Sequence, residues 1–211
     1  MVLLMIKFIK YFIQFIIIIF LFFIFILLGR KISSNLSACL FKIFGKFFRS
    51  NKIIESNLKI CFPENSNRTN NDIIDSMWDN YGRTLAEYLC LRSFQNNNDH
   101  IKILNINKLE SLKNSKDPVL FFSGHFGNFE LMAMELEKQG FQISALYRKL
   151  NNLFLNPIME FLRRSYICKD QISKPLPGKD KSGTRELLSR VKDKRNSALM
   201  VDQKLTEGIT A

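Results

Sequence analysis

The stretch SGHFGNFE, residues 123–130, places a histidine, two glycines and a carboxylate between two apolar runs. In a continuous helix His125 and Glu130 would point apart, because five residues turn the helix by about 140° beyond a full turn. If His125 lies in a turn before a helix, Glu130 falls in the first helical turn, where the helix dipole favours a carboxylate. The Glu130 carboxylate can then accept a hydrogen bond from one ring nitrogen of His125, which leaves the other nitrogen free to act as a base. This arrangement predicts a general base, His125, that Glu130 orients.

The same turn offers two candidate substrate contacts, Gly127 and Asn128. A glycine lets a substrate approach the backbone closely, and free amides at the start of a helix can bind an anion. The alternative is a capped strand-to-helix turn in which the histidine is incidental. The second histidine, His100, ends the polar run 96–100, and we expect it to be a solvent-exposed bystander.

Two other strand-like runs end in residues that could bind a substrate. Arg148 follows the run at 142–146, and Asp202 follows the run at 197–201. In parallel α/β sheets ligands bind beyond the carboxyl ends of the strands. The sequence therefore predicts that His125, Arg148 and Asp202 gather along one edge of a sheet.

Such a sheet is expected because strand-like and helix-like patterns alternate in the second half of the chain, which is typical of a mostly parallel α/β sheet flanked by helices. The predicted strands are 119–122, 142–146, 167–172 and 197–201. The predicted helices are 128–139, 153–164 and 182–193, the last with Ser182 as its N-cap, and an earlier helix at 72–91.

Near the N-terminus, residues 8–28 form a long apolar run, interrupted only by Lys10 and Gln14. As a helix these 21 residues extend about 31 Å, close to the thickness of a bilayer core. The run is too long for a cleaved signal peptide, and Gly-Arg-Lys at 29–31 stands where a cleavage site would be. We predict a retained single-pass transmembrane helix; the alternative is a buried helix of a soluble protein.

The net charge of +12 is concentrated beside this run. Up to residue 60, nine lysines and arginines oppose one acidic residue, Glu55, which leaves +8. Most of these bases follow the run, which predicts that the chain after residue 29 lies in the cytoplasm, at the inner membrane. A basic stretch also attracts anionic membrane lipids. A general compositional bias toward lysine would explain the total charge but not its clustering.

Residues 36–48 combine apolar positions at helical spacing with interleaved bases, which predicts an amphipathic helix. It could lie on the membrane surface or pack on the folded domain, and the pattern fits both equally. The four cysteines lack the spacing of a metal site, and we interpret them as reduced packing residues. They are Cys39, Cys61, Cys90 and Cys168.

Several stretches together resemble the lipid A late acyltransferases, the lauroyl and myristoyl acyltransferase family of Gram-negative bacteria. The histidine, four residues and acid of FFSGHFGNFE (121–130) resemble the core motif of glycerolipid-type acyltransferases. The segment ALYRKLNN (145–152) resembles a family segment with tyrosine, arginine and asparagine, although Lys149 replaces the usual proline. The remaining similarities are SNLKICFPENS (56–66), MVDQ (200–203), and one membrane helix before a basic region.

The resemblance implies a glycerolipid acyltransferase-like fold and the transfer of a fatty acyl group from acyl carrier protein to a hydroxyl of a lipid A precursor, without metal or bound cofactor. His125 would be the general base, and Glu130 would orient it and stabilise its cation. Arg148 and Arg163 would bind phosphate or carboxylate groups of the acceptor or stabilise developing charge. Asp202 would be a positioning residue.

Two departures from the family pattern concern the C-terminus and the second arginine. Family members continue past the D-Q segment into V-P-F-F-G, whereas this sequence stops at Ala211, so we expect a C-terminally truncated member. In RRSYICKD (163–170) either Arg163 or Arg164 could take the family role, and the spacing from Arg148 favours Arg163. The expected organisation is an anchor at 1–30, a basic membrane-proximal region at 31–62, and an incomplete acyltransferase domain at 63–211.

Other functions remain possible from the sequence. An acyltransferase for another acceptor, such as lysophosphatidic acid, usually carries aspartate as the motif acid and an F-P-E-G segment after the histidine; here Phe62-Pro63-Glu64 precedes it. A truncated chain could also be an inactive lipid-binding remnant. A nucleic-acid binder is disfavoured, because no aromatic–basic motif occurs and the charge adjoins a membrane segment.

Overall fold

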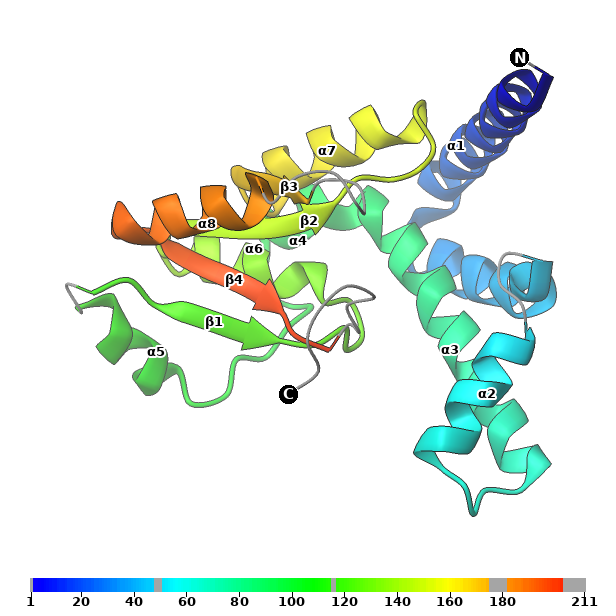
Figure 1. The fold of residues 1–211 in the computed structure, drawn as a ribbon, viewed down its shortest axis with the longest axis horizontal. Helices are drawn as coiled ribbons and strands as arrows, with labels where there is room; N and C mark the ends of the chain where they lie inside the picture. Colours follow the sequence, from blue (N-terminus) through cyan, green and yellow to red (C-terminus); the bar gives the residue numbers. More distant parts are fainter. Residues whose placement is uncertain (1, 48–50, 115–116, 175–181, 203–211) are drawn as a thin grey trace. The chain divides into compact units, whose positions relative to one another are not determined.

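A computed structural model describes residues 2–47, 51–114, 117–174 and 182–202 of the chain (Figure 1). The chain divides into two compact units. The first unit contains Met1–Phe15 and Leu91–Ala211, and the second contains Ile16–Cys90. These two units are defined by contacts between residues. The anchor, basic region and acyltransferase domain predicted from the sequence divide the chain by expected function instead.

Helix α1 (Val2–Phe44) begins in the first unit and continues through the second. It is kinked at Gly29, whose φ of 72° lies in the left-handed region that a glycine adopts without a steric penalty from Cβ. Among the described residues, α1 is long and apolar enough to cross a membrane by length and composition. The long apolar N-terminal helix predicted from residues 8–28 is therefore present.

The second unit is helical, and short apolar clusters hold it together. One cluster joins Phe22 and Phe25 of α1 to Ala86, and the other joins Ile54 and Leu58 to Trp78. Its further elements are η1 (Gly45–Phe47), α2 (Asn51–Cys61), α3 (Asn67–Glu87) and η2 (Tyr88–Cys90).

Two features of this unit refine the predictions from sequence. Helix α3 begins five residues earlier than predicted, because the hydroxyl of Ser66 caps it by accepting a hydrogen bond from the backbone N–H of Thr69. In the predicted amphipathic stretch, Phe41 packs against the Trp78 cluster while Phe44 and Phe47 stay exposed. The stretch therefore packs on the protein with one face and leaves other apolar side chains uncovered.

The first unit contains a four-stranded parallel sheet, as predicted, with the strand order β1-β4-β2-β3. Its strands are β1 (Leu120–Ser123), β2 (Ile143–Arg148), β3 (Asp170–Lys174) and β4 (Asn196–Met200). Its helices are α4 (Leu91–Asn96), α5 (Ile106–Lys113), α6 (Glu130–Lys138), α7 (Leu155–Tyr166) and α8 (Ser182–Lys192), and Figure 1 shows them flanking the sheet. Helix α5 was not predicted.

The strand order decides which helices share a face of the sheet. The chain crosses from β1 to β2 to β3 in one direction and returns from β3 to β4. Because parallel crossovers are right-handed, α6 and α7 lie on one face and α8 on the other. Helix α4 contacts both α6 and α7, in agreement with this arrangement. The core between these layers includes the fully buried Met134, Ile143 and Ile172.

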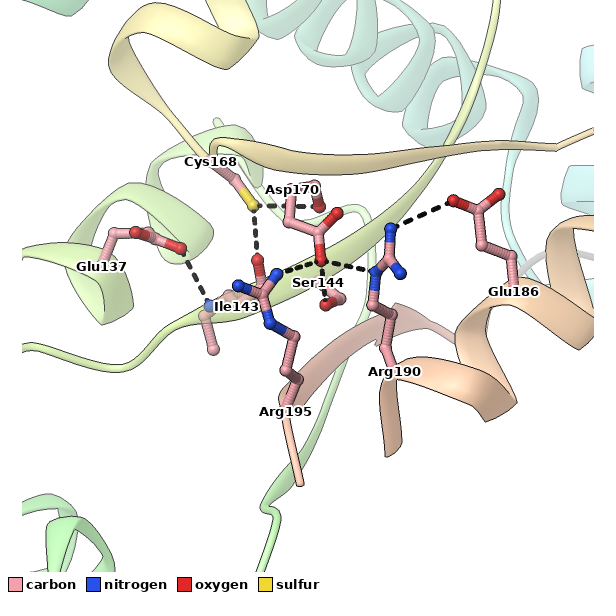
Figure 2. A network of polar contacts seen from close by, with 8 residues as sticks. All are labelled: Glu137, Ile143, Ser144, Cys168, Asp170, Glu186, Arg190 and Arg195. Carbon is pink, nitrogen blue, oxygen red and sulfur yellow. Dashed lines mark hydrogen bonds and ion pairs between the residues drawn. The ribbon is translucent and has the colours of Figure 1, made fainter. Parts of the chain in front are cut away.

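A polar network ties the sheet together at the amino-terminal ends of β2, β3 and β4 (Figure 2). The Asp170 carboxylate accepts hydrogen bonds from the hydroxyl of Ser144 on β2 (2.6 Å), from Arg190 on α8 (3.0 Å) and from Arg195 before β4 (2.7 Å). Burial alone would raise the pKa of Asp170, but these hydrogen bonds lower it below its ordinary value. The ionised carboxylate thus links three strands and a helix.

Two sequence-based expectations about side-chain exposure are wrong. The His100 side chain is only 5% exposed: its ring stacks on Phe94, and its Nε2 lies 3.3 Å from Oε1 of Glu135. The polar run before His100 does not place it in solvent, because the amine of Lys138 donates a hydrogen bond to the carbonyl of Asn97 and so fixes this segment. The four cysteines are free, and Cys168 is buried, but Cys39 and Cys61 are exposed and do not pack.

Some predictions fall on residues outside the described part of the chain. The side chain of Ser182 is one of them, so its capping role at the start of α8 stays a prediction. The others are Phe48, Arg49 and Gln203.

The Asp170 network predicts a specific pH dependence of stability. Because the folded pKa of Asp170 is lowered, its contribution is fully present above the unfolded value near 3.9 and is lost as pH falls through the folded pKa. We expect Asp170→Asn to lower the free energy of unfolding by about 2 kcal/mol at pH 7. The difference from the natural chain should shrink below about pH 4 in urea titrations.

The exposed Asp193, substituted as Asp193→Asn, provides the control and should change stability little at either pH. A difference for Asp170→Asn that stays constant from pH 7 to pH 3 would contradict an ionised, hydrogen-bonded Asp170.

Candidate active site

The pairing of β1 with β4 brings His125 and Asp202 together. Ser123 is paired with Met200 in the sheet, and the pairing continues as the N–H of Val201 donates to the carbonyl of Ser123 (3.0 Å). His125 and Asp202 each lie two residues beyond this matched pair. The backbone N–H of His125 donates to Oδ2 of Asp202 (2.7 Å), and Nδ1 of its ring lies 2.7 Å from Oδ1.

The charge state of Asp202 defines what the His125 ring can do. Hydrogen bonds from the backbone N–H of His125, and then from its side chain, lower the pKa of Asp202, so the carboxyl group is ionised at neutral pH. An ionised carboxylate can only accept hydrogen bonds, so Nδ1 must carry the proton of this contact. In the neutral ring Nε2 then has the free electron pair and can act as a base.

Glycines beside His125 serve the backbone geometry of this contact. A Cβ on Gly124 would lie 3.2 Å from Oδ2 of Asp202 and 2.7 Å from the Phe126 ring, so a side chain there would crowd the carboxylate. Gly127 has a φ of 51°, in the left-handed region that side chains disfavour. The expectation that Gly127 also contacts the substrate stays a prediction.

The Glu130 carboxylate holds Arg163. Glu130 begins α6, and its Oε1 accepts hydrogen bonds from Nε (3.0 Å) and Nη2 of Arg163, which comes from the last turn of α7. Both side chains are nearly buried, at 9% and 13% exposure. The pair can form because α6 and α7 cover the same face of the sheet. It identifies Arg163, rather than the exposed Arg164, as the arginine that enters the site.

A cavity of about 180 Å³ joins these groups at the carboxyl edge of the sheet. His125, Glu130, Arg148 and Arg163 all line it, with small and apolar side chains of β2 and β4 forming its floor. Asp202 reaches the cavity through its bond to His125. The structure thus gathers the predicted histidine, acids and arginines around one space. A base, a carboxylate and two guanidinium groups in one cavity suit proton transfer to or from an anionic substrate.

Sequence reasoning missed a second polar pair beside this cavity. The hydroxyl of Tyr147, which lines the cavity, donates to Oε1 of Glu160 (2.6 Å). Burial, followed by this hydrogen bond, raises the pKa of Tyr147 to about 12, so the phenol stays protonated. The guanidinium carbon of Arg163 lies 5.7 Å from the centre of the Tyr147 ring. No sequence pattern linked Tyr147 to Glu160, thirteen residues away in the next helix.

A larger, apolar cavity of about 590 Å³ lies between α5, β1 and the start of α6. Its lining is mostly leucine, isoleucine and phenylalanine, and the predicted substrate contact Asn128 lines this cavity. It shares Phe129 and Met132 with the smaller cavity. It was not predicted, because α5 forms one of its walls and carried no strong sequence pattern.

Comparison with protein families gives one match over nearly the whole chain. A family model described as bacterial lipid A biosynthesis acyltransferase matches residues 4–210. Searches of curated proteins and of solved structures found no match.

The Glu130–Arg163 pair makes a prediction for stability. We expect Arg163→Met to lower the free energy of unfolding by about 3–5 kcal/mol, because it leaves a buried carboxylate without its partner. Adding Glu130→Leu should recover most of the loss, since replacing both charges removes the uncompensated group. Chemical denaturation of the purified variants measures both effects.

The neighbouring exposed arginine is a matched control: Arg164→Met should change stability by less than about 0.5 kcal/mol. An Arg163→Met variant as stable as Arg164→Met would show that the pair does not form.

Proposed function

Because the chain belongs to the bacterial lipid A biosynthesis acyltransferase family, we propose that it transfers a fatty acyl group from acyl carrier protein to a hydroxyl of a lipid A precursor. The observation that carries this proposal is the His125–Asp202 contact at a cavity that two arginines also line. A base beside cationic groups fits an acceptor that bears both a hydroxyl and phosphates.

In the proposed reaction Nε2 of His125 takes the proton from the acceptor hydroxyl as its oxygen attacks the thioester carbonyl. The tetrahedral intermediate then collapses, the carbon–sulfur bond breaks, and the imidazolium returns the proton to the leaving thiolate. Asp202 keeps the ring in the reactive tautomer and stabilises its cation. General-base catalysis of this kind typically contributes about 10²–10⁴-fold. The chemistry uses side chains alone and calls for no metal or bound cofactor.

The arginines take the recognition role. Glu130 fixes the guanidinium group of Arg163 in the cavity, and Arg148, at the exposed end of β2, can reach an acceptor phosphate. Glu130 lines the same cavity as His125, and the sequence-based expectation that it orients His125 stays a prediction. Gly127 and Asn128, in the turn after His125, are the remaining proposed substrate contacts, and Asn128 lines the larger, apolar cavity.

Two features support acyl carrier protein as the acyl donor: the apolar cavity and the net charge of the chain. The apolar cavity of about 590 Å³ falls in the usual size range of ligand pockets and suits a hydrocarbon chain. It adjoins the smaller cavity through Phe129 and Met132, so an acyl chain placed there would bring its carbonyl toward His125. The net charge of +12 complements an acidic carrier protein.

The apolar helix α1 and the bases after Gly29 support attachment to the inner membrane with the active site facing the cytoplasm, where acyl carrier protein is found. An inactive lipid-binding member of the family is the second candidate function, as the sequence analysis left open. The two differ in turnover alone, so an activity assay decides between them.

We expect His125→Ala to lower the turnover of a folded variant by at least about 100-fold. Asp202→Asn should also lower kcat, because an amide can donate to Nδ1 and so leave the proton on Nε2. The double variant should be little worse than His125→Ala alone, since groups that act as a unit are non-additive. The assay uses acyl carrier protein thioester and a lipid A precursor, with Asp193→Asn as an unaffected control.

Near-normal turnover by folded His125→Ala would contradict the mechanism. Absence of turnover in the natural chain, with retained binding of the lipid acceptor, would favour the lipid-binding alternative.

Glu130→Gln separates the two roles of Glu130. If Glu130 acts mainly by holding Arg163, the KM for the lipid acceptor should rise several-fold while the pH dependence of kcat stays unchanged. A fall in kcat equal to that of Asp202→Asn, without a change in KM, would instead assign Glu130 to His125. Steady-state kinetics from pH 5 to pH 9 distinguish these results.

A further inference from the structure

The side chain of Tyr147, at the end of β2, is held by two residues of α7. Its hydroxyl donates to Oε1 of Glu160 (2.6 Å), and the guanidinium carbon of Arg163 lies 5.7 Å from the centre of its ring. Glu160 and Arg163 are three residues apart on α7, so they lie on the same side of this helix. Tyr147 is thus joined to α7 through both its hydroxyl and its ring.

Glu160 also fixes the loop that connects β2 to α7. The same Oε1 accepts a hydrogen bond from Nδ2 of Asn156 (2.9 Å). Oδ1 of Asn156 in turn accepts one from the backbone N–H of Leu150 (2.9 Å). Arg148 lies between Tyr147 and Leu150, so the chain is bonded to α7 directly before this arginine and two residues after it. These bonds give Arg148, at the exposed end of its strand, a defined backbone position.

The hydrogen bonds of Glu160 also set its charge. The bond from Tyr147 is the main cause that lowers the pKa of Glu160, against the effect of burial, and the bond from Asn156 adds to it. An ionised carboxylate can only accept hydrogen bonds, so the phenol proton of Tyr147 stays directed at Glu160. Lys149 lies 3.9 Å from the same oxygen, but its side chain is half exposed, and such an ion pair contributes little.

The network meets the candidate active site at its two arginines. Tyr147, Arg148 and Arg163 all line the cavity of about 180 Å³, whereas Glu160 is not among the residues that line it. Glu130 holds the guanidinium group of Arg163 through hydrogen bonds, and the Tyr147 ring lies against the same group. Any effect of Glu160 on a bound substrate must therefore act through the residues that it holds.

We propose that Glu160 and Tyr147 are positioning residues, which hold Arg148 and Arg163 in the arrangement that binds the anionic groups of the acceptor. This inference rests on the proposed function, in which the arginines recognise the acceptor. A guanidinium group binds a phosphate through two parallel hydrogen bonds, so its orientation matters as well as its charge. Residues that fix this orientation contribute to acceptor affinity without touching the acceptor.

Kinetics of the purified full chain test this role. We expect Tyr147→Phe, which keeps the ring, and Glu160→Leu each to raise the KM for a lipid A precursor about threefold or more. The kcat and the KM for the acyl carrier protein thioester should change much less, because His125 and the apolar cavity are untouched. Glu160→Gln should stay close to the natural chain, since its amide oxygen can accept both hydrogen bonds of Oε1.

The half-exposed Tyr81 of the second unit, substituted as Tyr81→Phe, is the matched control and should leave both KM values unchanged. Tyr147→Phe is the milder change and decides the test if Glu160→Leu does not fold. Equal increases in KM for Glu160→Leu and Glu160→Gln would overturn the inference, because the charge of Glu160, rather than its hydrogen bonds, would then be responsible.

A second measurement needs no substrate. The Nε–H of Arg163 donates to Glu130, and its ¹⁵N nuclear magnetic resonance signal can be assigned by its loss in Arg163→Lys. We expect this proton to exchange faster with solvent in Tyr147→Phe and Glu160→Leu than in Glu160→Gln, Tyr81→Phe or the natural chain.

The same exchange rate in all these proteins would overturn the inference, whatever their turnover. A natural chain without turnover, in which exchange responds as expected, would contradict the proposed function and still support the positioning of Arg163. The failure of the inference is thus distinguishable from the failure of the proposed function.

Discussion

The parallel pairing of β1 with β4 is the constraint on which the candidate site depends. It matches Ser123 with Met200, so the chains leaving the two strands carry His125 and Asp202 to the same level. Two hydrogen bonds then join the residues, one through the backbone and one through the ring. Because the pKa of Asp202 is lowered, the carboxylate accepts, Nδ1 donates, and Nε2 is the reactive nitrogen. A shift of one residue in this register would separate the pair.

The charged groups around this base are held by packing on one face of the sheet. Helices α6 and α7 share that face as a consequence of strand order and crossover handedness, and this lets Glu130 meet Arg163. The sheet itself is tied at its other end by Asp170, which binds β2, α8 and the approach to β4 (Figure 2). Polar networks at both ends of the strands thus fix the positions of the strands that carry the site.

Sequence patterns predicted the strands, the helices and the reactive residues better than they predicted which strands and residues contact one another. Alternating patterns and strand-end residues were enough to predict a parallel sheet with His125, Arg148 and Asp202 at one edge. They could not show that β4 lies beside β1, because strand order depends on packing between distant segments. For that reason Asp202 was expected only to position the substrate or the site, and its bond to Nδ1 of His125 emerged from the structure.

Other differences have the same origin. The sequence of helix α5 carries only a weak helical pattern. Its side chains line an apolar cavity together with those of β1 and α6, which are distant or separate elements in the sequence. His100 was expected in solvent from its polar neighbours, but its environment is set by Phe94 and Glu135, which the local sequence does not reveal. The contact of Asn152 with Tyr11 joins residues 141 positions apart. Local sequence patterns thus predicted helices and strands, whereas contacts between distant segments determine which side chains meet.

The assignment of His125 as the base is tested most directly by the tautomer of its ring, observed by ¹⁵N nuclear magnetic resonance on the full chain in detergent, at a pH where the ring is neutral. We expect a proton on Nδ1 and a free electron pair on Nε2, with loss of this preference in Asp202→Asn. A neutral ring that carries its proton on Nε2 in the natural chain would contradict the assignment of His125 as the base.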